Sequence, residues 1–163
     1  MKNRRGFSLV ELIVVVAIIA TLLTIVTLDF SSWSRKAQIE RQTRELFADL
    51  NKARLDSVFM KRRHKIVMQP NGYTFFRFSS ADESRTTGGT IVETRNVTYQ
   101  MTKVNGTSSI ADRIFEFDAR GFTNDLDTIR VNPADTAAQV DCIVVHTART
   151  NLGKIENNAC VLK

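Results

Sequence analysis

The sequence predicts an α+β protein, in which one long N-terminal α-helix packs on a C-terminal head of antiparallel β-strands, built as one sheet or as a β-sandwich. Three observations predict this class. No Gly or Pro occurs from Phe7 to Gln69, so nothing obliges a helix to break there. Apolar residues recur at helical spacing within this stretch, and after Lys65 short apolar runs alternate with turn residues. A helix followed by closely spaced strands is typical of the α+β class.

The first expected element is an apolar helix behind a basic leader. Lys2, Arg4 and Arg5 precede a run in which residues 12–28 contain only threonine as a polar residue. A secretory signal has an apolar core of about 7–15 residues followed by a small-residue cleavage site, and no such site follows here. From Phe7 to Leu28 a helix would rise about 33 Å, enough to cross a hydrocarbon core of about 30 Å. The leading cations favour a cytoplasmic N-terminus with the rest of the chain exported.

Glu11 lies at the front of this apolar run. An ionised carboxylate inside a bilayer costs at least about 2.5 kcal/mol, so it is a functional-site hypothesis that requires a partner. The competing interpretation is an ordinary signal anchor with a glutamate near the membrane surface, where a carboxylate costs less.

The helix is expected to continue to about Lys61 as an amphipathic segment. Its apolar stripe follows spacings of seven, four, three and four residues, with charged residues on the opposite faces. The stripe consists of Ile39, Leu46, Leu50, Ala53 and Ser57, widened by Phe47 and Val58, and the charged faces carry Arg41, Arg44, Glu45, Asp49, Lys52 and Asp56. Residues 61–65 (KRRHK) are expected to end the helix, where cations complement its dipole; a nucleic-acid patch is the less favoured interpretation.

Short strands are expected beyond this point, at 66–68, 73–76, 90–104, 113–118, 128–131, 140–146 and 159–162. A hairpin is predicted at residues 70–72 (PNG), because Asn-Gly tolerates positive φ. Residues 79–89 are polar and are expected to form an exposed loop.

Cys142 and Cys160 both follow the apolar run, so they would lie in the exported part. An oxidising compartment allows a disulfide, which would stabilise the head by about 3 kcal/mol for a loop of this size. Two unpaired thiols are the alternative. No third cysteine is present to complete a structural zinc site, so no metal or other cofactor is expected.

Residues 6–12 (GFSLVEL) closely resemble the processing site of type IV prepilins and type II secretion pseudopilins. The resemblance implies that a prepilin peptidase cleaves between Gly6 and Phe7 and that Phe7 becomes N-methylated. It also implies that Glu11 directs filament assembly by pairing with the N-terminal amine of a neighbouring subunit. Such a pair would attract strongly in a filament core, since each charge offsets the other's desolvation.

The same resemblance implies how the chain is organised and where it works. Residues 1–6 would be a cleaved leader, 7–33 the transmembrane and assembly half of the helix, and 34–163 a periplasmic head that includes the amphipathic half. The protein would cross the bacterial inner membrane once, surrounded by lipid, before it enters a pilus or pseudopilus. Its partners would be other pilin or pseudopilin subunits, the prepilin peptidase and the inner-membrane assembly platform. Removing the three cations of the leader would leave 20 Lys and Arg against 17 Asp and Glu, a balance that does not indicate nucleic acid.

Three later segments resemble the GspH/FimT-type minor pilins: residues 51–66, residues 115–121 (FEFDARG) and Gly153-Lys154-Ile155, where lysine stands in place of the usual arginine. They imply a minor pilin or pseudopilin that primes or caps a filament, with a β-sandwich head.

Two other functions are weighed. The first is a DNA-binding minor pilin of a competence pilus, with Arg149, Lys154 and Lys163 as contacts. Glu156 lies among these cations and no aromatic residue lies close for stacking. The second is a membrane-anchored enzyme, with a calcium site at Asp118, Asn124, Asp125 and Asp127. Their spacing does not match an EF-hand loop, and no catalytic motif accompanies them. We therefore expect a structural subunit and no enzyme.

Overall fold

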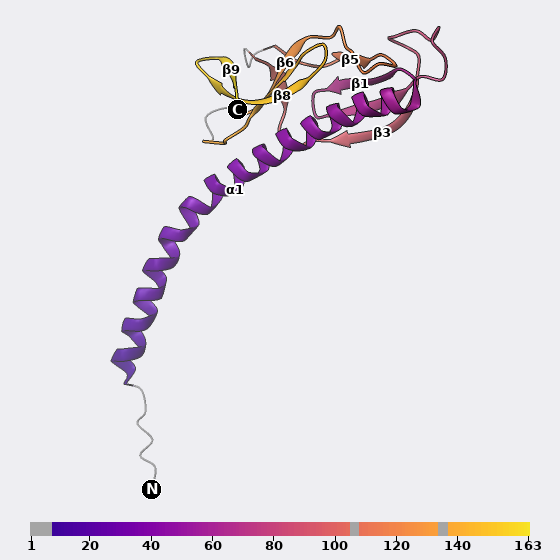
Figure 1. Ribbon diagram of the computed structural model, residues 1–163. Helices are drawn as coiled ribbons and strands as arrows, with labels where there is room; N and C mark the ends of the chain where they lie inside the picture. The colour runs from indigo at the N-terminus through magenta and orange to yellow at the C-terminus, as the bar shows by residue number, and fades with distance from the viewer. Residues whose placement is uncertain (1–7, 105–107, 134–136) are drawn as a thin grey trace. The chain divides into compact units, whose positions relative to one another are not determined.

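The computed structural model describes residues 8–104, 108–133 and 137–163, and the side chains of all of these except 23–29 (Figure 1). The chain divides into two compact units, Met1–Arg35 and Lys36–Lys163. The predicted cleavage and methylation residues, Gly6 and Phe7, lie outside the described residues.

Helix α1 (Leu9–Met60) confirms the long unbroken helix predicted from the absence of Gly and Pro. Within the described residues, no helix has both the length and the apolar character needed to cross a membrane.

Helix α1 ends at Met60, directly before residues 61–65, where its end was expected. The last helical turn contains no basic residue, so these cations do not complement the dipole from within it. Lys61 instead adopts φ of 53°, and the Arg62 N–H donates to the Ser57 carbonyl at 3.2 Å. This is the bond pattern of a Schellman motif, with lysine at the left-handed position that glycine usually occupies.

The strands form two antiparallel sheets in the head, which confirms the α+β class. The four-stranded sheet has the order β3 (Thr90–Asn96), β2 (Gly72–Arg77), β1 (His64–Gln69) and β5 (Ile114–Phe117). The five-stranded sheet has the order β4 (Met101–Lys103), β6 (Asp127–Val131), β7 (Cys142–Val145), β8 (Thr150–Glu156) and β9 (Ala159–Leu162).

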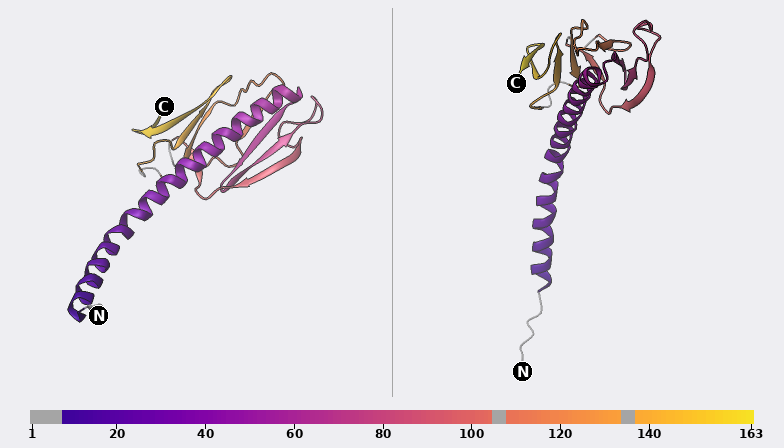
Figure 2. Two further views of the ribbon diagram at one scale, coloured as in Figure 1. Left: turned by 60° about the horizontal axis from the view of Figure 1, so that its bottom comes forward. Right: turned by 45° about the vertical axis from the view of Figure 1, so that its right-hand side comes forward.

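Both sheets pack against the part of α1 that belongs to the head, from Lys36 onward, and the strands of the two sheets lie on either side of it (Figure 2). One hydrophobic core joins the three elements. The predicted stripe is buried as expected, from Ile39 to Ser57. It meets β1 and β5 in one sheet and β6 and β7 in the other, through Ile66, Met68, Phe115, Phe117, Ile129, Val131, Ile143 and Val145.

One residue assigned to the charged faces of the helix is in fact buried. Asp49 is 8 % exposed and accepts a hydrogen bond from the Tyr73 hydroxyl at 2.7 Å. Its carboxylate also lies 3.2 Å from Arg95 Nε. The charge of Asp49 alone predicts an exposed position on the helix. Its partners on β2 and β3 make its burial favourable.

The predicted hairpin at residues 70–72 is present, but its mechanism was wrong. Gln69 pairs with Gly72, so Pro70 and Asn71 form the turn, and neither Asn71 nor Gly72 has positive φ. Gly72 is required for another reason: a Cβ there would lie 2.4 Å from the Arg95 carbonyl oxygen on β3.

The single strand expected at 90–104 is two strands, β3 and β4, which belong to different sheets. Strand β8 was missed by the strand pattern, although the resemblance at Gly153-Lys154-Ile155 falls within it. The missed signal was Asn157-Asn158. Both residues have positive φ, 50° and 60°, and they form a two-residue turn between the paired Glu156 and Ala159.

Candidate functional site

The N-terminal part of α1 presents an apolar surface to solvent. Its ten large apolar side chains between Leu9 and Leu22 are 47 to 73 % exposed. A soluble protein rarely exposes a continuous apolar surface of this kind, and one that does has an interaction site there.

Glu11 lies in the first turn of α1 and is exposed beside these apolar side chains. Ser8 precedes the helix, and its carbonyl accepts a hydrogen bond from the Leu12 N–H at 3.2 Å. The spacing from Ser8 to Glu11 is that of a capping box, in which a Glu or Gln three residues after the cap supports the helix start. A carboxylate in the first turn also complements the positive end of the helix dipole. This position allows Glu11 to support the start of the helix, so a test of its assembly role must distinguish assembly from helix capping.

Comparison with known proteins identifies the N-terminal segment alone. Residues 1–27 match the family model described as the prokaryotic N-terminal methylation motif. No curated protein and no solved structure matches the chain. The match supports a type IV prepilin-like N-terminus, with methylation and with pilin subunits and a prepilin peptidase as the general class of partner. It covers a minor part of the chain and gives no subfamily for the head.

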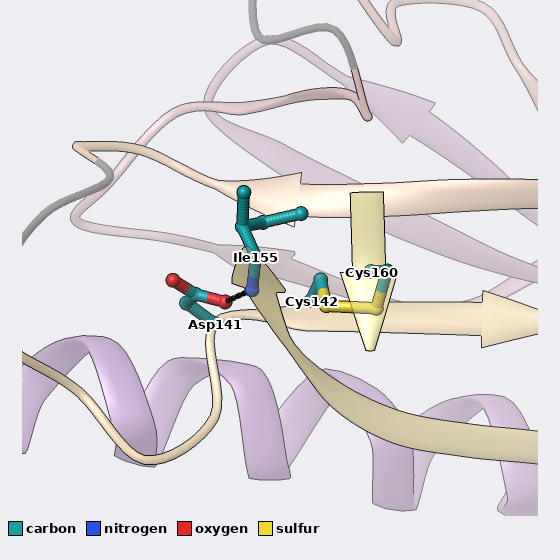
Figure 3. The surroundings of a disulfide bond; sticks show 4 residues. All are labelled: Asp141, Cys142, Ile155 and Cys160. Atoms are coloured by element: carbon teal, nitrogen blue, oxygen red, sulfur yellow. Dashed lines mark hydrogen bonds between the residues drawn. A yellow bond between two sulfur atoms is a disulfide. The ribbon is translucent and has the colours of Figure 1, made fainter. Parts of the chain in front are cut away.

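In the head, Cys142 on β7 and Cys160 on β9 form a disulfide with a Cα–Cα distance of 6.1 Å (Figure 3). Strand β8 lies between these two strands. Two strands on either side of a third lie about 9–10 Å apart in a flat sheet. The shorter separation means that the β8–β9 hairpin curls toward β7, so that the disulfide passes over β8.

Gly153 is the residue of β8 that allows this crossing. A Cβ at Gly153 would lie 2.6 Å from Cys160 Sγ, 2.6 Å from the Val161 carbonyl oxygen and 3.1 Å from Cys142 Sγ. Backbone conformation does not demand glycine here, since its φ is not positive. The space taken by the disulfide demands it.

Asp141, beside the disulfide, extends the hydrogen bonding between β7 and β8 at the residue before β7 begins. Its carboxylate accepts a hydrogen bond from the Ile155 N–H at 2.7 Å (Figure 3), and its own N–H donates to the Gly153 carbonyl at 3.1 Å. Burial raises the pKa of this carboxyl, and the Ile155 hydrogen bond and the charges of Arg130 and Lys154 oppose the rise.

Two of the three predicted DNA contacts, Lys154 and Lys163, lie close to each other across the β8–β9 pair, where Lys154 is opposite Val161. Lys163 Nζ lies 3.8 Å from the Glu156 carboxylate. Arg149 is exposed in the turn before β8, whereas Lys154 lies half-buried on β8. Five residues of extended strand separate these two by about 16 Å. Phosphate binding gains from several cations on one surface, and here Glu156 offsets the charge of Lys163 while Arg149 lies apart from Lys154.

Three of the four residues considered for calcium form ion pairs with arginine side chains. Asp125 pairs with Arg85, Asp127 with Arg113 at 3.0 Å, and Asp118 with Arg120 at 3.2 Å. Throughout the described residues, no group of three or more His, Cys, Asp or Glu is placed to hold a metal ion.

Asp118 has a structural role in the turn after β5. Its Oδ1 accepts hydrogen bonds from the Arg120 and Phe122 N–H groups, each at 2.9 Å. Burial favours a higher pKa for this carboxyl, but the Phe122 and Arg120 hydrogen bonds outweigh it and lower the pKa. Gly121 in this turn has φ of 83°, and a Cβ there would lie 2.8 Å from Val58 Cγ2 on α1. The glycine thus allows the turn to approach the helix.

Arg54 fastens this turn to α1, a role that sequence reasoning missed. Its Nη1 donates to the Gly121 carbonyl at 2.7 Å and to the Thr147 carbonyl at 3.0 Å, and Nη2 donates to the His146 carbonyl at 3.2 Å. The guanidinium also lies 4.9 Å from the centre of the Phe117 ring. Burial lowers its pKa. One helical side chain therefore joins loops from both sheets.

Lys65 and Arg63, which belong to the basic stretch 61–65, hold the loop at residues 79–89. Lys65 is 1 % exposed, and its Nζ donates to the Arg85 carbonyl at 2.8 Å and to the Thr86 carbonyl at 3.1 Å. Arg63 donates to the Ala81 and Glu83 carbonyls at 2.9 and 2.7 Å. These cations support the loop and are not presented to nucleic acid.

Proposed function

We propose that this chain is a pilin-like filament subunit. A prepilin peptidase would cleave it between Gly6 and Phe7 and methylate Phe7, leaving residues 7–33 to anchor it in the bacterial inner membrane before assembly. The observation that carries the proposal is the methylation-motif match over residues 1–27. The exposed apolar surface from Leu9 to Leu22 supports it, because lipid or neighbouring helices would remove that surface from water. The assignment of residues 7–33 as a membrane anchor is argued from the apolar sequence, which extends to Leu28.

The processing step has a direct test. Co-expression with a prepilin peptidase should yield a protein that lacks residues 1–6 and carries one additional methyl group on Phe7. Intact-mass measurement and N-terminal fragment sequencing would detect both changes, and the same chain without the peptidase is the control. An uncut chain in both samples would contradict the proposal.

For the filament, we propose that the Glu11 carboxylate pairs with the methylated amine of a neighbouring Phe7. Before assembly the carboxylate stays near the membrane surface or bears the cost of desolvation, and pairing offsets that cost. A shifted axial position would leave one charge buried alone, so the pair also favours one register.

Glu11→Gln separates this assembly role from the capping role. Glutamine serves in a capping box as glutamate does, but it carries no charge to pair with an ammonium. The proposal predicts that Glu11→Gln and Glu11→Ala both reduce incorporation into filaments to a similar degree, measured against total membrane protein. Normal incorporation of Glu11→Gln with loss in Glu11→Ala would leave only a helix-capping role.

Within the pilin-like class, we propose a minor pilin or pseudopilin of the GspH/FimT type, which primes or caps a type IV pilus or a type II secretion pseudopilus. The two-sheet head supports this, as does the tight glycine turn at Gly121 against α1. Immunogold labelling at filament ends, with a much lower copy number than the main subunit, is the expected result. Uniform labelling along the shaft would contradict a priming or capping role.

A further inference from the structure

Two large aromatic side chains follow the apolar run on α1. Phe30 is 64 % and Trp33 65 % exposed, and their ring centroids lie 6.3 Å apart, one helical turn from each other. Trp33 is the sole tryptophan of the sequence. Both rings belong to the N-terminal unit, and neither belongs to the buried core of the head.

These rings continue the apolar side of the helix. Phe30 and Trp33 are eight and eleven residues beyond Leu22, which at 3.6 residues per turn places them about 80° and about 20° around the helix from it. Leu22 itself is 58 % exposed. The exposed surface therefore changes along its length from aliphatic to aromatic.

The position of the rings along the helix matches the layer where aromatic residues are most stable in a bilayer. If hydrocarbon ends at Leu28, Phe30 is about 3 Å and Trp33 about 7.5 Å beyond it, at 1.5 Å per residue. The headgroup layer on each side of the hydrocarbon is about 5–8 Å thick. An indole in this layer keeps its ring against apolar chains while its N–H donates to water or phosphate.

The charge that follows fits the same layer. Arg35, two residues after Trp33, is exposed. A guanidinium at the membrane surface is attracted to the anionic phosphates of lipid headgroups. After the apolar run and Asp29, the aromatic residues and then Arg35 succeed one another toward the aqueous phase.

We infer that Phe30 and Trp33 form an interfacial anchor that binds the phospholipid headgroup layer on the exported side of the membrane and sets the depth of the apolar helix. The inference rests on the proposed membrane anchoring of residues 7–33. Before the subunit assembles, lipid covers this aromatic surface.

The fluorescence of Trp33 can report the depth of its ring in the bilayer. The full-length chain would be reconstituted into phosphatidylcholine–phosphatidylglycerol vesicles at low protein density, with bromine atoms near the headgroup, along the middle of the acyl chain or near the bilayer centre. We expect the shallow bromines to quench Trp33 fluorescence most and the deepest bromines least. Aqueous acrylamide should quench it less than it quenches free tryptophan.

Two variants move the tryptophan to other depths along the helix. In Phe30→Trp/Trp33→Phe the indole moves about 4.5 Å toward the apolar run, and in Leu22→Trp/Trp33→Phe about 16 Å, since the helix rises 1.5 Å per residue. The lipid that quenches most should therefore be the shallow one for tryptophan at position 33 and a deeper one for tryptophan at position 22. Tryptophan at position 30 should give an intermediate depth.

The outcomes separate the inference from the proposed function. A chain that does not float with vesicles on a density gradient overturns membrane anchoring and the inference with it. A chain that floats, but whose Trp33 is quenched most by deep bromines or is fully open to acrylamide, overturns the inference alone. Protection of Trp33 from acrylamide and from every brominated lipid would identify a protein partner over the ring, which also overturns it.

Discussion

The two units of the chain differ in how far their apolar and charged side chains are exposed to solvent. In the N-terminal unit every large apolar side chain from Leu9 to Leu22 is about half exposed or more. In the head, apolar residues from α1 and both sheets form one buried core, and even charged groups such as Lys65 and Asp49 are buried with partners from the same chain.

This difference indicates where each unit obtains its stability. The head carries its own core, its own ion pairs and a disulfide, so its fold depends on packing within one chain. Burying the apolar surface of the N-terminal unit would release free energy only through contact with lipid or another subunit. The comparison assigns folding to the head and association to the N-terminal helix.

The largest expected effect comes from truncating one leucine in each unit. Leu46 is fully buried, so Leu46→Ala should lower the free energy of unfolding by about 2–5 kcal/mol. Leu22→Ala, on an exposed position of the same helix, should change it by less than about 0.5 kcal/mol. Urea unfolding in detergent, followed by circular dichroism, measures both. Equal effects would remove the distinction between the units.

The next effect concerns the disulfide of the head. Replacing both cysteines, as Cys142→Ala with Cys160→Ala, should cost about 3 kcal/mol of unfolding free energy, the value expected for a loop of this size. Because the disulfide occupies the space above β8, Gly153→Ala should cost about 1–3 kcal/mol in the oxidised protein.

In the chain without cysteines, the cost of Gly153→Ala should be smaller, since only the contact with the Val161 carbonyl remains. This double-mutant cycle measures the coupling directly. An equal cost of Gly153→Ala in both backgrounds would contradict the role assigned to the glycine.

A smaller effect is a pH dependence that belongs to the head. The pKa of Asp141 is raised in the folded state by burial, so the native state holds its proton more firmly than the unfolded chain. The contribution of Asp141 to stability is therefore full below the unfolded carboxyl pKa of about 3.9 and is lost as pH rises through the raised folded value.

Asp141→Asn tests this dependence, because its amide oxygen still accepts the Ile155 N–H while the charge is absent. Relative to the variant, the parent should lose stability between the unfolded and folded pKa values of Asp141 as pH rises. Glu83 provides the opposite control: hydrogen bonds from the Ser80, Gly89 and Ser79 N–H groups lower its pKa, so its contribution is lost as pH falls. A parent-minus-variant difference that is constant with pH would contradict the effect of Asp141.

The smallest expected effect is on DNA. Since Lys163 pairs with Glu156 and Arg149 lies apart from Lys154, residues 36–163 should retain little DNA at low salt and none at moderate salt. Arg149→Ala should not change that result. Retention at low salt that falls steeply with added salt, and that weakens in Arg149→Ala, would favour the competence-pilus alternative.

Periodicity and turn residues were enough to predict much of the fold. The helix stripe from Ile39 to Ser57 followed from spacing, because one face of a helix must be apolar to cover a sheet. The failures occurred where a partner distant in the sequence decides. Charge alone placed Asp49 on the solvent side, and only Tyr73 and Arg95 make its burial favourable. Likewise, the Lys65 ammonium is satisfied by carbonyls twenty residues away.

The sequence by itself determined the processing motif, the position of Glu11, the apolar run and the aromatic residues that end it. These are local patterns along one stretch of the chain, and they can be recognised without any tertiary contact. Only the tertiary structure decided that residues 90–104 divide between two sheets, that Arg54 joins both, and that Gly153 lies under a disulfide. Close packing depends on which distant segments meet, and no local pattern contains that information.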